Sequence, residues 1–177
     1  MMKRVLIVLF AVSLATGIAF ANEHGGAGGP GPDNGGPGGN LLVGSDGTVY
    51  VTHTVVDTST HTSTTTVTAI RSTGATAWSV TLPTNAGHLT LSGSNLIAVH
   101  GVRASDGTVT TTLTAISAAT GATAWTKTIN GEVTDLTPFS GGTYAVVVVP
   151  PTTSGGTATR SLVAIGNDGS TLWTVAL

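Results

Sequence analysis

The chain has 177 residues, of which 8 % are charged, with 25 glycines, no cysteine and a formal net charge of −2. This length suits one domain of ordinary size. The lack of cysteine excludes a disulfide scaffold, a thiolate metal site and a cysteine nucleophile, and the lack of a basic patch argues against binding to nucleic acid.

Residues 1–21 have the organisation of a cleavable signal peptide. Lys3 and Arg4 precede an apolar run, and the small-x-small sequence AFA ends at Ala21. We predict cleavage after Ala21 and a secreted or periplasmic protein that has no membrane attachment afterwards. An uncleaved membrane anchor is the alternative, for which the apolar run is a little short.

Residues 22–40 are rich in glycine and proline. Glycine brings a high backbone entropy and proline blocks regular hydrogen bonding, so we predict a flexible linker. A phosphate-binding loop is not expected, because no strand precedes the segment and no Gly-Lys-Ser/Thr sequence ends it.

Residues 41–177 divide into three units of about 47 residues, a typical blade-sized repeat, with boundaries near 41–87, 88–132 and 133–177. Each unit contains four strand-like stretches separated by turn sequences such as Asp46-Gly47. The expected strands, with the turn included after the first of each unit, are 41–47, 48–56, 65–70 and 75–82, then 88–94, 95–102, 111–116 and 122–129, then 134–142, 143–149, 161–165 and 170–177. We therefore predict an all-β chain of three four-stranded antiparallel meanders. They resemble β-propeller blades and form an incomplete ring or part of a larger or oligomeric propeller.

Every unit also repeats an alanine, a glycine and a tryptophan. The glycine precedes the tryptophan by four residues, and the alanine precedes the glycine by five or six. The three sets are Ala69, Gly74 and Trp78, then Ala115, Gly121 and Trp125, then Ala164, Gly169 and Trp173.

This pattern resembles the tryptophan-docking motif of the PQQ-like (quinoprotein alcohol dehydrogenase-like) β-propeller repeat family. In that family the indole packs over the glycine turn and the small alanine of the neighbouring blade. The resemblance covers residues 41–177 and implies that the nine motif residues hold successive blades together. Only the second unit has the full-length form of the motif.

Enzymes of that family hold pyrroloquinoline quinone and a calcium ion at the mouth of a closed ring, using carboxylates, an asparagine and often adjacent cysteines from several blades. This chain has no cysteine, three blades cannot enclose the cofactor, and the carboxylates fall mostly in turns. We therefore expect no enzyme activity and no cofactor. A fragment or relative of a PQQ-dependent quinoprotein dehydrogenase is the alternative.

His53 and His100 are 47 residues apart, which is the repeat distance. Counted from Thr48 and Asn95 they occupy equivalent positions on the same face of successive blades, and the same count in the third unit gives Val148. A two-histidine site for a metal or a proton is one interpretation. We favour a pair of buried neutral imidazoles that hydrogen-bond to threonines of the next strand, and we predict no metal site.

Three blades are fewer than the roughly four to eight of a closed propeller, and the open faces of the outer blades would leave apolar surface in water. We expect a non-catalytic binding or scaffold module, which has a protein partner or self-associates through its open blade edges. If the domain recognises a partner, the hairpin tips at 57–64, 103–108 and 150–160 and the channel mouth are the other candidate surfaces. For the tips themselves we favour the interpretation that they are merely solvated loops. A threonine-rich extracellular protein that polymerises is the structural alternative.

Overall fold

A computed structural model describes residues 41–60, 62–82, 86, 88–151 and 155–177. The predicted signal peptide and linker lie outside the described residues, as do parts of the hairpin tips at 57–64 and 150–160. Within the described ranges, no helix has the length and apolar character needed to cross a membrane.

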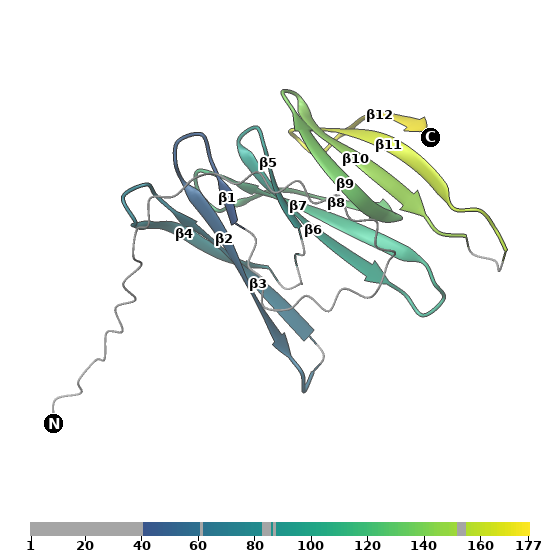
Figure 1. Cartoon of the computed structure of the whole chain (residues 1–177), viewed down its shortest axis with the longest axis horizontal. Helices are drawn as coiled ribbons and strands as arrows, with labels where there is room; N and C mark the ends of the chain where they lie inside the picture. Colours follow the sequence, from purple (N-terminus) through teal and green to yellow (C-terminus); the bar gives the residue numbers. More distant parts are fainter. Residues whose placement is uncertain (1–40, 61, 83–85, 87, 152–154) are drawn as a thin grey trace, which may run out of the picture. The chain divides into compact units, whose positions relative to one another are not determined.

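The described residues form twelve β-strands and no helix (Figure 1). Blade 1 consists of β1 (Leu41–Val43), β2 (Val49–Asp57), β3 (Thr62–Ile70) and β4 (Thr76–Leu82). Blade 2 consists of β5 (His88–Ser92), β6 (Asn95–Arg103), β7 (Val109–Ser117) and β8 (Thr123–Asn130). Blade 3 consists of β9 (Glu132–Phe139), β10 (Gly142–Val149), β11 (Thr159–Gly166) and β12 (Thr171–Ala176).

Each blade is a four-stranded antiparallel sheet in which every strand pairs with its neighbour in the sequence. The predicted all-β fold of three antiparallel meanders is confirmed, and the described sheets do not close into a ring. The largest difference in a strand boundary within blade 1 is at β3, which begins at Thr62 and not at residue 65. The Asp57 carboxylate accepts hydrogen bonds from the backbone amides of Ser59 and Thr60, which favours a turn directly after Asp57, and strand pairing extends to Asp57 and Thr62.

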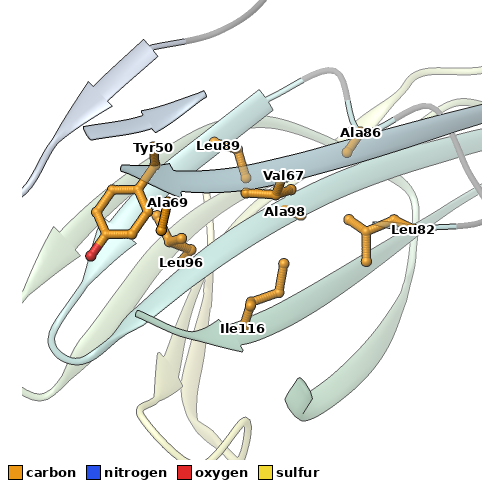
Figure 2. Packing of buried hydrophobic residues seen from close by; sticks show 9 residues of the cluster. All are labelled: Tyr50, Val67, Ala69, Leu82, Ala86, Leu89, Leu96, Ala98 and Ile116. Carbon is orange, nitrogen blue, oxygen red and sulfur yellow. The ribbon is translucent and has the colours of Figure 1, made fainter. Parts of the chain in front are cut away.

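A buried hydrophobic cluster lies at the junction of blades 1 and 2, and Figure 2 shows its nine buried residues. They are Tyr50, Val67, Ala69, Leu82, Ala86, Leu89, Leu96, Ala98 and Ile116. A second cluster lies at the junction of blades 2 and 3 and consists of Ile97, Leu113, Ala115, Leu136, Ala145, Val147, Val163 and Ile165. Strand β6 contributes Leu96 and Ala98 to the first cluster and Ile97 to the second, because successive side chains of a strand point to opposite faces. The middle blade is thus buried on both faces, which explains the uninterrupted apolar run of residues 96–99 in β6.

The strand registers align the motif residues in the same way in all three blades. Tyr50 pairs with Ala69, which pairs with Trp78. The corresponding rows are Ile97, Ala115 and Trp125 in blade 2, and Tyr144, Ala164 and Trp173 in blade 3. The register shifts directly after each of the three alanines, so the repeat extends to the backbone irregularity itself.

Candidate functional site

Trp78 joins blade 1 to blade 2. Its cross-strand neighbour Ala69 is completely buried, and this small side chain leaves room for the indole. The Trp78 Nε1–H donates a hydrogen bond of 2.9 Å to the Ala118 carbonyl of blade 2. A Cβ placed on Gly121 would lie 2.8 Å from the Trp78 ring, so the indole rests directly on the Gly121 backbone.

Trp125 joins blade 2 to blade 3 with the same geometry. The Trp125 Nε1–H donates to the Asn167 carbonyl at 2.8 Å, and a Cβ on Gly169 would lie 2.8 Å from the ring. The Lys127 ammonium adds a 3.0 Å hydrogen bond to the Gly169 carbonyl. The chain therefore contains two copies of one blade-to-blade contact.

Tyr50 strengthens the first of these contacts. Its ring lies 5.9 Å from that of Trp78 at an interplanar angle of 39°, a favourable tilted arrangement. The Tyr50 hydroxyl donates to the Ala118 carbonyl at 3.4 Å, so both side chains converge on one acceptor. Burial raises the pKa of the Tyr50 hydroxyl above its ordinary value of 10.0, and the group is a hydrogen-bond donor at neutral pH.

Blade 3 carries the same tryptophan and tyrosine, and no blade among the described residues is docked on them. Trp173 pairs with Ala164 as in the other blades, but 42 % of its surface is exposed. Tyr144 lies 5.6 Å from it at 40°. Leu162 and Val175 form the adjacent cross-strand pair on this face. We call Tyr144, Leu162, Trp173 and Val175 the donor face.

Blade 1 carries the opposite half of the contact. Gly74 has a φ of +84°, close to the +76° of Gly121 and the +83° of Gly169, but a Cβ placed on it would meet no atom of the described residues within 4 Å. Leu41 pairs with Val51 and Val43 with Val49, on the face opposite to the Leu42 and Tyr50 pair that packs against blade 2. Leu41 and Val43 are 64 % and 61 % exposed. We call Leu41, Val43, Val49, Val51 and Gly74 the acceptor face.

His53 and His100 lie at equivalent positions, opposite Thr66 and Thr112 in the strand register. His53 is exposed. It lies three residues after Tyr50 along β2 and therefore on the opposite face of the strand, which points away from blade 2. His100 is half-buried on the face of blade 2 that packs against blade 1. The prediction of two buried imidazoles is therefore wrong for His53, and the sheet of blade 1 separates the two side chains.

The third-unit equivalent of these histidines is Val147, and the prediction of Val148 is wrong by one position. Val147 pairs with Ser161, three residues before Ala164, just as His53 pairs with Thr66, three residues before Ala69. The prediction counted positions from residue 143, whereas β10 begins one residue earlier, at Gly142. Val147 is buried in the cluster between blades 2 and 3. Across the part of the chain that the structure describes, no three His, Asp or Glu side chains are grouped in a way that could hold a metal ion.

Four exposed turn aspartates have lowered pKa values, because they accept hydrogen bonds from residues two or three positions ahead. The Ser59 hydroxyl and amide, followed by Thr60, lower the pKa of Asp57 to about 2. Hydrogen bonds from Thr48, Thr108 and Ser170 lower the pKa of Asp46, Asp106 and Asp168. These bonds assign the four carboxylates to turn formation.

A cavity of about 150 Å³ lies beside strands β5, β6 and β9. It is lined by His88, Val99, Val133, Thr134, Asp135 and Leu136. The sequence repeat did not single out His88 and Asp135, which line the same cavity although they belong to different blades. The space suits a few water molecules and is small for an organic ligand.

Two threonines missed by the sequence analysis hold the segments that connect one blade to the next. Thr65 accepts a hydrogen bond from the Ala86 amide at 3.0 Å. Thr111 donates to the Gly131 carbonyl at 2.7 Å and accepts from the Val133 amide at 3.2 Å. Both threonines lie four residues before a motif alanine, and that recurrence was the signal that could have identified them.

Comparison of the chain with protein-family models and with curated proteins finds no match. The functional argument consequently rests on the two tryptophan contacts and on their unfilled counterparts.

Proposed function

We propose that the chain is a secreted or periplasmic, non-catalytic interaction module of the PQQ-like propeller type, which binds protein through the open faces of its outer blades. The observation that carries the proposal is the donor face. Its tryptophan is 42 % exposed, whereas the equivalent indoles of blades 1 and 2 rest on a neighbouring blade. A contiguous apolar face with an exposed indole is typical of a protein-binding surface.

Both outer faces support the same function. The acceptor face exposes Leu41 and Val43, and the donor face exposes Val175 next to Trp173. Both faces present exposed apolar side chains, and the buried centres of protein interfaces are more apolar than the rest of the surface. The secretion signal predicted at residues 1–21 favours a partner outside the cytoplasm.

A photo-crosslinking residue placed at Val175 in the producing cell tests this function. We expect covalent adducts with protein from position 175 and none from position 128, where Thr128 is exposed on the last strand of the middle blade, β8. If position 175 yields no protein adduct, the proposed function is wrong.

The enzymatic alternative requires a separate assay. Purified chain is mixed with pyrroloquinoline quinone and calcium, and the reduction of an electron-accepting dye is followed with alcohol and sugar substrates. We expect no dye reduction above that of the cofactor alone. Reduction that depends on the chain would contradict a non-catalytic role.

A further inference from the structure

We infer that the donor face of blade 3 docks on the acceptor face of blade 1 in a second copy of this chain, so that copies join head to tail. The inference rests on the proposed interaction function and names the partner. Trp173 of one copy lies on Gly74 of the next, and its Nε1–H donates to the Ser72 carbonyl.

The donor side is already arranged for this contact. Tyr144 and Trp173 are 5.6 Å apart at 40°, and Tyr50 and Trp78 are 5.9 Å apart at 39°. In blade 1 this pair holds the next blade by donating to one carbonyl. Blade 3 therefore presents the same two donors in the same mutual geometry, so little side-chain ordering remains for binding.

The acceptor side matches the two turns that receive a tryptophan. A backbone hydrogen bond closes each turn, from Arg71 to Ala75, from Ser117 to Ala122 and from Gly166 to Ser170. The residue after the first member of each pair supplies the acceptor carbonyl, namely Ala118 and Asn167. The corresponding residue in blade 1 is Ser72. The φ of Gly74, +84°, matches the +76° of Gly121 and the +83° of Gly169.

The apolar residues around Gly74 correspond to residues that are buried or partly buried at the junction of blades 1 and 2. By strand register, Leu41, Val43, Val49, Val51 and Ile70 are equivalent to Leu89, Leu91, Leu96, Ala98 and Ile116. On the donor side, Val175 is equivalent to Val80, which packs against that cluster. Blade 1 thus retains the side chains of a docked blade.

A second copy explains one departure from the repeat. Thr65 and Thr111 bind the segment that connects their blade to the next, and Arg160 stands at the equivalent register position in blade 3. A blade supplied by another copy brings no such connecting segment, so no hydroxyl is required there. The three described blades of each of two copies make six, which is within the range of about four to eight blades in closed propellers. A head-to-tail contact closes a ring or, if the rotation does not close, forms a filament.

The solution mass of the full chain, expressed with its leader and purified, tests the inference. Light scattering on a sizing column is recorded over a dilution series. We expect a species with twice the mass of one chain, or a series of higher multiples if the contact does not close a ring. A monomer at every concentration up to about 100 µM, where even a weak specific contact is populated, would overturn the inference.

Substitutions on the two faces identify the contact. Trp173→Ala removes the indole, and Gly74→Asn places a side chain where the indole must lie while tolerating the positive φ. Each substitution should weaken association about thirtyfold or more, as for the loss of a central interface residue. The controls are Thr174→Ala, an exposed neighbour of Trp173 on the opposite face of β12, where it pairs with Val163, and Gly107→Asn, at φ +86° with no described atom within 4 Å. Both controls should associate like the wild type. Association unaffected by Trp173→Ala and Gly74→Asn would show that the contact lies elsewhere.

Mixing the two variants separates a head-to-tail contact from other arrangements. A Trp173→Ala chain retains the acceptor face and a Gly74→Asn chain retains the donor face, so a mixed pair has one intact junction. We expect the mixture to associate more strongly than either variant alone and more weakly than the wild type. A mixture no stronger than its components would contradict the inference. A monomeric chain whose position 175 still crosslinks to a different protein would disprove self-association and leave the proposed function standing.

Discussion

At Gly121 and Gly169 the chain has no Cβ, and the indoles of Trp78 and Trp125 occupy the space that one would take. The positive φ of both residues disfavours any other amino acid. Glycine is thus required at these positions for two reasons, a backbone conformation and a close approach. At Gly107 only the first reason applies, because a Cβ there would meet no atom within 4 Å.

The difference between these glycines can be measured. Gly121→Ala should lower the free energy of unfolding by about 1 kcal/mol through its backbone conformation and by about 1–3 kcal/mol more through the clash with the Trp78 indole. The control Gly107→Ala should show only the first loss. Urea unfolding followed by circular dichroism compares the two variants. Equal losses would mean that the indole contact with Gly121 contributes nothing.

At the scale of elements, neighbouring blades are joined by short segments whose backbone groups need partners. Thr111 is buried and satisfies the Gly131 carbonyl and the Val133 amide at the connection from β8 to β9. Thr65 has a related role for Ala86, before β5. The hydroxyl groups in this threonine-rich core therefore fix the path of the chain from one blade to the next.

Thr111→Val keeps the shape of the side chain and removes these hydrogen bonds. We expect a loss of about 1–3 kcal/mol in unfolding free energy, since two backbone groups lose their partner. Thr110→Val, on the opposite face of β7, should change the stability by no more than about 0.5 kcal/mol. Thermal and urea unfolding of both variants provide the measurement. If the two variants are equally stable, the connection does not depend on Thr111.

For the whole molecule, the acid response follows from the turns. The folded-state pKa values of Asp46, Asp57, Asp106 and Asp168 are lowered from the ordinary value of 3.8. Groups with a depressed folded pKa stabilise the fold above the unfolded pKa, and this contribution is lost as the pH falls through the folded value. Because all four carboxylates are exposed, solvent screens each contribution.

We therefore expect the unfolding temperature to fall between about pH 4 and pH 2, the window set by the ordinary pKa and by the value of about 2 for Asp57. Ser59→Ala removes the hydroxyl that lowers this pKa most, so the pKa of Asp57 should rise toward 3.8. Carbon-13 NMR of the carboxyl group during a pH titration measures the change. An unchanged midpoint would show that the Ser59 hydroxyl does not hold the carboxylate.

The amino-acid sequence by itself determined the three meanders and the equivalent positions of their motif residues. Apolar alternation, Asp-Gly turns and the repeat distance act over a few residues, and they were enough to predict strands such as β7 and β8 nearly at their observed bounds. One residue of uncertainty at the start of β10 was enough to exchange Val147 for Val148, since a shift of one residue turns a strand position to the other face.

Only the tertiary structure decided which of the repeated residues are covered. Trp78, Trp125 and Trp173 are equivalent in the sequence, but among the described glycines only Gly121 and Gly169 carry a docked indole, that of Trp78 and that of Trp125. The equivalent positions of His53 and His100 in the repeat also could not show that the sheet of blade 1 separates the two side chains. The physical reason is that burial depends on what lies across a junction between segments more than forty residues apart, and no local pattern encodes it.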